Sequence, residues 1–394
     1  ILYTYTTTIA KRKKMTLFEP VQVGTYQLQH RVVHAPLTRL RNTKVTNIPT
    51  DLVVEYYSQR ATSGGLIIAE ASLISNKSGG YFNVPGLFTE DQLKGWGKVI
   101  QAVHEKDGII FSQMWHGGRG GSSFFIKDNQ LPLAPSPIPI TSSNNPFMEN
   151  KPYEVPREAS HNDIKDLVQQ YVTAAKNSIA AGFDGVEIHG ANGSLIHQFI
   201  SSSSNKRTDD YGGTIPNQAR FALEVAEAVT NAIGPERTGI RFSPWAGAEV
   251  DIKDETPYET YSYILEHLNP KLAYVHFIEP RDDALREVPD LVNSLDPFRK
   301  IWQGRPFISA GGYSTQPESM ADVAENTGNL IAVGRAYIAN PDLVERLKHG
   351  WPLNKYKREF FYTTDALGYT DYPFYNAKDT TTIINNQSQQ KVVK

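Results

Sequence analysis

The chain of 394 residues is 40% hydrophobic and carries 40 basic and 42 acidic side chains, which give a formal net charge of −2. This balance provides no general electrostatic attraction to nucleic acid or acidic membranes, and no apolar run approaches the roughly 20 residues that span a bilayer. The absence of cysteine excludes disulfides, thiolate metal sites and a cysteine nucleophile. We therefore expect a soluble, cytoplasmic protein without a nucleic-acid or membrane partner.

Both ends of the chain differ in composition from the rest. The Lys-Arg-Lys-Lys run at residues 11–14 follows an apolar stretch instead of preceding it, which is the reverse of a secretory signal. The last residues are polar and rich in Thr, Asn and Gln. The sequence predicts a disordered extension over residues 1–15, one domain over residues 16–376 and a polar tail over residues 377–394.

Short β-branched runs alternate with longer helical patterns along this domain. Strands are predicted over residues 31–36, 65–71, 108–115, 185–189, 239–243, 273–279, 306–311 and 329–334. Helices are predicted over residues 51–62, 90–106, 162–181, 217–233, 257–268, 288–302, 317–326 and 341–349. Eight strands, each followed by a helix, predict a single (β/α)8 TIM barrel, an α/β fold whose chemistry lies at the carboxyl ends of the strands.

One excursion interrupts the alternation between the third strand and its helix. It covers residues 116–160 and contains Gly-Gly-Arg-Gly-Gly followed by a proline-rich run. Loops of this length without regular structure are usually functional or disordered. We expect this one to form a cap over the barrel mouth.

The strand ends have no metal character, because no carboxylate or second histidine stands at a ligand spacing from His189. They offer instead a hydroxyl at Thr38, an amide at Gln113 and a guanidinium at Arg241, all able to hydrogen-bond a heterocycle. The loops after the seventh and eighth strands, the usual phosphate site of such barrels, contain glycines and an arginine. These residues are Gly311, Gly312, Gly334 and Arg335. The sequence therefore predicts a flat, phosphorylated cofactor and no metal.

Six motifs follow one another along the barrel. They are Pro36-Leu37-Thr38-Arg39, Glu55-Tyr-Tyr-Ser-Gln-Arg60, Ser112-Gln-Met-Trp-His116, Gly185-Val-Glu-Ile-His189-Gly-Ala-Asn192-Gly, Asn205-Lys-Arg-Thr-Asp-Asp-Tyr-Gly-Gly213 and Val333-Gly-Arg335. Together they resemble the old yellow enzyme family of flavin-dependent ene-reductases, from about residue 17 to residue 375. We expect a fungal member of this family.

The resemblance implies a TIM barrel that binds FMN noncovalently, accepts hydride from NADPH or NADH, and passes it from the flavin N5 to the β-carbon of an enone or enal. This is an NADPH dehydrogenase type of activity, in a monomer or homodimer. His189 and Asn192 would both donate hydrogen bonds to the substrate carbonyl oxygen, and Thr38 would tune the flavin. The implied cofactor-binding residues are Pro36, Thr38, Ala71, Gln113, Arg241, Gly311, Gly312, Gly334 and Arg335. The implied substrate-binding residues are Tyr81, Trp115, His189, Asn192 and Tyr362.

The chain departs from the family at Ser194, where many relatives carry a tyrosine that protonates the α-carbon of the substrate. A serine hydroxyl is shorter and far less acidic than a phenol, whose pKa is about 10. Three outcomes stay open. Water, Tyr81 or Tyr362 protonates the substrate instead, or slow protonation makes the protein a redox-neutral double-bond isomerase. Alternatively, Ser194 enlarges the pocket for a bulky substrate of specialised metabolism.

Two other classes compete with the reductase. One is a flavin-binding protein with weak turnover, which the intact pair of His189 and Asn192 opposes. The other is a flavin-free aldolase or hydrolase, which needs a Schiff-base lysine or paired carboxylates at the strand ends. Glu70 and Glu279 are the only carboxylates there, and neither has an evident partner in the sequence.

Overall fold

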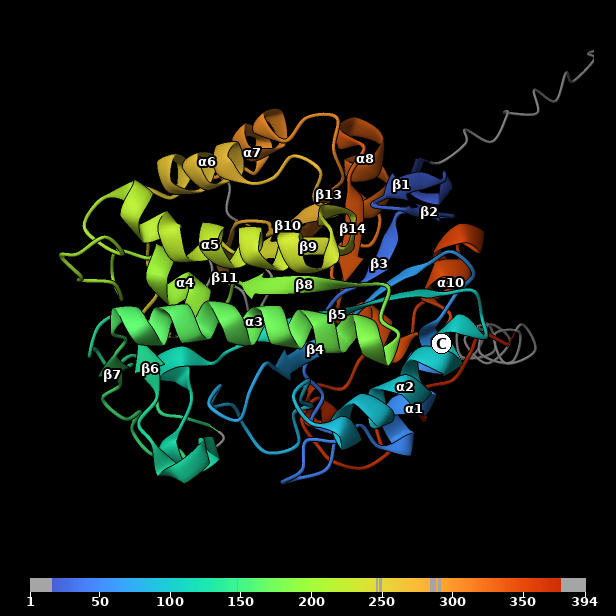
Figure 1. Cartoon of the computed structure of the whole chain (residues 1–394). Coiled ribbons are helices and arrows are strands. Elements are labelled where there is room, and N and C mark those ends of the chain that lie inside the picture. Colours follow the sequence, from blue (N-terminus) through green and yellow to red (C-terminus); the bar gives the residue numbers. More distant parts are fainter. Residues whose placement is uncertain are drawn as a thin grey trace, which may run out of the picture.

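The computed structural model of the chain describes residues 16–146, 148–245, 247, 250–283, 288–289 and 292–376. Eight parallel strands close into a barrel, and helices surround it (Figure 1). In order around the barrel the strands are β3 (Val32–His34), β4 (Leu66–Leu73), β5 (Ile109–Trp115), β8 (Gly185–Gly190), β9 (Thr238–Phe242), β10 (Tyr274–Ile278), β13 (Phe307–Ala310) and β14 (Leu330–Val333). The (β/α)8 prediction and all eight predicted strands are confirmed. The predicted segments 1–15 and 377–394 lie outside the described residues.

Helices follow the strands along the chain. They are α1 (Asp51–Arg60), α2 (Glu90–His104), α3 (His161–Ala181), α4 (Leu195–Ile200), α5 (Ile215–Ile233), α6 (Pro257–His267), α7 (Asp296–Ile301), α8 (Ser319–Thr327), α9 (Arg335–Ala339) and α10 (Leu343–His349). Local signals set several of their starts. Thr89 and Gln92 form a capping box at the start of α2, and Ser160 and Asp163 form another at the start of α3.

One helix prediction is wrong in its first half. Residues 288–302 were expected to be helical, but Val288–Pro289 form a short strand, β12, which pairs with β11 (Arg281–Asp283), and α7 begins only at Asp296. The Ser294 hydroxyl accepts a hydrogen bond from the Asp296 backbone N–H at 3.0 Å. Pro297 lies in the first turn, where its missing N–H costs nothing, whereas inside a longer helix it would break a hydrogen bond.

The end of the barrel where the strands begin is closed by an N-terminal hairpin. Its strands are β1 (Val21–Val23) and β2 (Tyr26–Leu28). Val23 and Leu28 pack with side chains from inside the barrel such as Phe111, whose ring lies 6.4 Å from that of Tyr26. This apolar plug leaves the opposite end of the barrel for polar chemistry.

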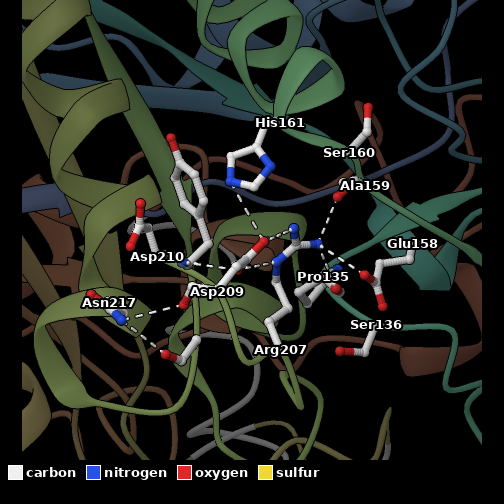
Figure 2. Close-up of polar contacts among 12 residues, drawn as sticks. Pro135, Ser136, Glu158, Ala159, Ser160, His161, Arg207, Asp209, Asp210 and Asn217 are labelled. Carbon is white, nitrogen blue, oxygen red and sulfur yellow. Dashed lines mark hydrogen bonds and ion pairs between the residues drawn. The ribbon is translucent and has the colours of Figure 1, made fainter.

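The excursion at residues 116–160 lies at that opposite end (Figure 1). It contains three 3-10 turns and the short strands β6 (Leu133–Ala134) and β7 (Arg157–Glu158). Arg207, whose side chain is 3% exposed, fastens it, because Nη1 donates to the carbonyl oxygens of Pro135 at 3.0 Å and Ala159 at 2.6 Å (Figure 2). Asp209 in turn binds the Arg207 Nε at 2.9 Å. The excursion is therefore anchored to the loop between α4 and α5.

Candidate active site

The carboxyl ends of the strands surround a cavity of about 420 Å³. It is lined by Pro36, Leu37, Thr38, Arg39, Ala71, Tyr81, Gln113, Trp115, His189, Asn192, Arg241, Arg335, Ile338, Arg358, Phe361 and Tyr362. A second cavity of about 160 Å³ adjoins it and shares four of its residues, including Arg241 and Arg335. Gly311, Gly312 and Gly334 line this second cavity. The structure thus brings together every residue predicted to bind cofactor or substrate.

The smaller cavity suits an anionic group. Gly311 and Gly312 have φ angles of 118° and 79°, a backbone region that glycine enters without steric cost. A Cβ added to Gly312 would meet no atom within 4 Å, so the backbone there borders open space. Arg241 and Arg335 supply positive charge on the same wall. These groups fit the phosphate end of FMN, while the hydroxyl of Thr38 and the amide of Gln113 in the larger cavity fit the polar edge of its ring.

A buried carboxylate lies behind the pocket wall. Glu187 on β8 accepts a hydrogen bond from Gln113 Nε2 at 2.7 Å and another from His276 Nδ1 at 2.8 Å, and the side chains of Glu187 and His276 have no exposed surface. Sequence reasoning missed both residues. Because Gln113, Glu187 and His276 come from three separate strands, only the barrel register brings them together.

His189 lies near the end of β8, and Asn192 lies in the turn just after the strand. Both line the larger cavity. Among the described residues, the buried Nδ1 of His189 has no hydrogen-bond partner. Burial, together with the charge of Arg241, lowers the pKa of His189 well below its usual value, so the ring is neutral at neutral pH. Asn192 has a left-handed φ of 51°, and its backbone N–H donates to Ser243 Oγ at 2.8 Å. In the part of the chain described, no hydrogen bond joins the side chains of His189 and Asn192.

Ser194 does not line the cavity. It is 3% exposed and lies directly before α4, where its Oγ donates to the carbonyl oxygen of His189 at 2.6 Å. The neighbouring turn is braced as well, because Gln198 Nε2 donates to the Gly193 carbonyl oxygen at 2.7 Å. The hydroxyl at this position is therefore committed to the backbone of the strand end.

Aromatic side chains border the cavity on its outer side. The rings of Tyr81 and Trp115 lie 5.4 Å apart, and Tyr362 is 56% exposed. Burial, with smaller effects from Tyr153 and Tyr362, raises the pKa of the Tyr81 phenol above its usual value. Tyr81 therefore keeps its proton across the neutral pH range.

The C-terminal segment forms one wall of the cavity. Sequence reasoning predicted Tyr362 there but missed its neighbours Arg358 and Phe361. Arg39 is 1% exposed, and its Nε donates to the carbonyl oxygen of Phe361 at 3.0 Å while its Nη2 donates to that of Gly368 at 2.7 Å. Arg41 Nη1 donates to the same Phe361 oxygen at 2.9 Å. These two arginines, which lie in the segment after β3, thus fix Phe361 and Tyr362 against the cavity.

The chain is similar to known flavoenzymes over most of its length. The model of the NADH:flavin oxidoreductase / NADH oxidase family matches residues 16–354. Flavin oxidoreductase hxnT of Emericella nidulans is 43% identical over 91% of this chain and 97% of its own. 12-oxophytodienoate reductase 1 of Oryza sativa subsp. japonica is 42% identical over 93% and 95%.

Solved structures agree with these relatives. The old yellow enzyme homologue from Zymomonas mobilis has a TM-score of 0.84 at 36% identity, over 91% of this chain and 99% of that chain. Morphinone reductase, solved in complex with tetrahydroNAD, has a TM-score of 0.81 at 38% identity, over 92% and 98%.

The fold and the match of the family model define an FMN-dependent oxidoreductase. The chain belongs to the NADH:flavin oxidoreductase family, within the old yellow enzymes. It is an NAD(P)H-dependent enzyme that acts on carbon–carbon double bonds. In the described residues, no group of three or more His, Asp or Glu side chains is placed to hold a metal ion. Nor is any helix of the described ranges long and apolar enough to cross a bilayer.

Proposed function

We propose that the protein is an ene-reductase that reduces the double bond of an enone or enal, with His189 and Asn192 binding the carbonyl oxygen. The observation that carries this proposal is the position of both side chains on the wall of the cavity that Thr38, Gln113 and Arg241 also line. When bound, FMN supplies hydride received from NADPH or NADH to the β-carbon of the substrate.

The two donors act on the charge that develops during this addition. Hydride addition at the β-carbon places negative charge on the carbonyl oxygen, as in an oxyanion. Removing one preplaced donor from such a site costs about 3 to 4 kcal/mol of transition-state stabilisation. Neutral His189 suits the role, because its ring donates one N–H without bringing a net charge to the carbonyl group.

In this proposal the cofactor lies along the two adjoining cavities. Gln113 and Arg241 bind the pyrimidine edge of the ring, Thr38 and Ala71 approach its other polar atoms, and Pro36 borders it. Gly311, Gly312, Gly334 and Arg335 hold the phosphate. Tyr81, Trp115 and Tyr362 contact the substrate from the rim.

The proton that completes the reduction comes from a group other than Ser194. Support for this step is the hydrogen bond from Ser194 Oγ to the His189 carbonyl oxygen at 2.6 Å, which turns the hydroxyl toward the backbone. Tyr81 lines the cavity and retains its phenol proton, and the cavity also admits water. We assign the α-carbon proton to Tyr81 or to water beside it.

A second candidate activity follows from the same hydrogen bond. If no donor reaches the α-carbon quickly, the enolate rotates about its single bond between the α- and β-carbons and the β-carbon gives a hydride back to the flavin. The net reaction is then a redox-neutral isomerisation of the double bond. A bulky substrate of specialised metabolism, and a fungal source, stay predictions.

Anaerobic reduction of the purified protein with NADPH, followed by a panel of enones, tests the proposal. An ene-reductase reoxidises its flavin and releases saturated product. An isomerase converts the enone into the other isomer of its double bond while the flavin stays reduced. A protein without bound FMN, or with neither outcome, would contradict both activities. A flavin-free aldolase or hydrolase is disfavoured further because Glu70 and Glu279 do not line the cavity.

A further inference from the structure

Glu187 is a buried charge one layer below the substrate-binding pair. It lies two residues before His189 on β8, and alternation along the strand directs both side chains to the inside of the barrel. Gln113 is its partner across the β5–β8 register, and Arg241 is the partner of His189 on β9. The carboxylate therefore lies behind two side chains of the cavity wall.

Glu187 is ionised. Burial alone would raise its pKa, but the His276 ring, the Arg241 guanidinium and the Gln113 amide outweigh burial and lower the pKa below its usual value. His276 has a pKa lowered by burial, so its neutral ring donates Nδ1–H to the carboxylate at 2.8 Å. The wall of the cavity thus contains a permanent negative charge close to Arg241.

The carboxylate also decides how the Gln113 amide is turned. An ionised carboxylate accepts hydrogen bonds and cannot donate them, so the amide must present its Nε2–H to Glu187 Oε1. The amide oxygen of Gln113 is then left to the cavity that Gln113 lines. A ligand at this point must offer a hydrogen-bond donor, and the pyrimidine part of a flavin carries one as a ring N–H.

We propose that Glu187, held in place by His276, is a positioning residue for FMN, which orients the Gln113 amide and partly offsets the charge of Arg241. The inference rests on the proposed placement of Gln113 and Arg241 at the pyrimidine edge. Two-electron reduction adds negative charge to this part of the flavin. A fixed carboxylate behind it disfavours the reduced form, and so lowers the reduction potential.

Glu187→Gln tests the effect of charge. The substitution keeps the volume and both hydrogen bonds, since the glutamine oxygen accepts from Gln113 and its NH2 donates to the other tautomer of His276. We expect reduced FMN to gain about tenfold in binding relative to oxidised FMN, which raises the midpoint potential by about 30 mV for a two-electron couple. The potential is measured by anaerobic titration against a reference dye, without any enone.

Glu187→Leu tests the effect on orientation. It frees the Gln113 amide to rotate, and we expect the apoprotein to bind oxidised FMN about tenfold more weakly in a fluorescence titration, the effect of one lost fixed hydrogen bond. Ser112→Ala is the matched control, because it removes a buried hydrogen bond on the outer side of β5, where Ser112 Oγ donates to Ser178 Oγ at 2.9 Å. This control must leave the potential and the FMN affinity as they are in the wild type.

His276→Leu provides a second variant if the Glu187 variants do not fold. It removes one of the donors that keep Glu187 ionised, so the potential shifts upward as in Glu187→Gln. An unchanged potential in Glu187→Gln or in His276→Leu would overturn the role of the charge, and unchanged FMN affinity in Glu187→Leu would overturn the role in orientation. Neither readout depends on turnover. Absent enone reduction in a wild type that binds FMN would therefore refute the proposed function alone.

Discussion

Ser194 donates its hydroxyl proton to the backbone carbonyl oxygen of His189 at 2.6 Å, across the turn that joins β8 to α4. Ser194, which the family resemblance predicts at the position of a tyrosine proton donor, is therefore part of the support of the strand end. It stabilises the turn from which His189 and Asn192 reach the cavity, and its proton is directed to the strand backbone.

The Ser194→Ala variant therefore distinguishes a structural role of Ser194 in the turn from a role in proton transfer to the substrate. We expect the free energy of unfolding to fall by about 1 kcal/mol, because one buried hydrogen bond is lost. The rate of flavin reoxidation by a small enone should stay within about twofold of the wild type, against the ~10²-fold or greater loss expected for removal of a general acid. Stopped-flow absorbance measures this rate, and a hundredfold loss would show that Ser194 is the acid after all.

Ser194→Tyr introduces the phenol that the family resemblance predicts at this position. If a missing acid limits turnover, reoxidation by small enones becomes faster, by up to about 10²-fold. If the small side chain of Ser194 instead enlarges the pocket for a bulky substrate, the variant loses activity on a bulky enone and reacts with small enones as the wild type does. The same rates for both substrates as in the wild type would contradict both explanations.

Asn192→Gly removes, with little strain, the amide that we propose binds the substrate carbonyl oxygen. Glycine tolerates the left-handed φ of 51° at this position, so the turn should keep its conformation. We expect the reoxidation rate with enones to fall about 10²- to 10³-fold, as for the loss of an oxyanion-hole donor. Flavin reduction by NADPH and FMN content serve as internal controls. An unaffected reoxidation rate would exclude Asn192 from substrate binding.

Buried histidines make the protein less stable in acid. Burial lowers the pKa values of His34, His116 and His197 to about 3, against about 6.5 in the unfolded chain. Between about pH 6.5 and 3 these histidines are protonated in the unfolded chain but neutral in the folded chain. The free energy of unfolding therefore falls as the pH falls toward about 3. Each histidine contributes a slope of about 1.4 kcal/mol per pH unit.

Glu70 acts in the opposite direction. Burial raises its pKa to about 7, so the folded chain binds a proton first and stability is lost as the pH rises from about 4.5 to 7. Glu70 thereby offsets the contribution of one histidine. The net slope near about pH 5 stays positive, because burial also lowers the pKa values of His30, His189 and His276. Urea unfolding at several pH values measures the slope. His34→Gln should reduce the slope by about 1.4 kcal/mol per pH unit, and an equal slope would contradict the assignment.

Arg207→Lys should release the excursion from the loop after α4. Lysine cannot reach the carbonyl oxygens of Pro135 and Ala159 and the Asp209 carboxylate together, as the guanidinium does (Figure 2). We expect limited proteolysis to cut residues 131–159 more rapidly than in the wild type. Arg157→Lys is the control, because its pair with Asp163 is partly exposed and contributes about 1 kcal/mol or less. Equal cleavage of both variants would contradict the anchoring role.

The eight barrel strands were predictable from sequence because each is a short, fully buried run that contains β-branched residues. The helix α4 was not, since all six of its residues are buried and it shows no alternation between apolar and polar faces. In the site, residues at strand ends could be predicted from their order alone. The bond between Gln113 and Glu187 joins residues 74 positions apart, and that between Glu187 and His276 joins residues 89 apart. Such pairs depend on barrel register, which no local pattern contains.

The hydrogen bonds from Arg39 and Arg41 to the Phe361 carbonyl oxygen have a consequence for biosynthesis. The cavity wall combines residues 36–39, which follow β3, with Arg358, Phe361 and Tyr362. A nascent polypeptide therefore has no complete cavity until translation has passed Tyr362. FMN can be inserted only after that point, so an expressed protein can accumulate as apoprotein whenever production of the chain outpaces the supply of FMN.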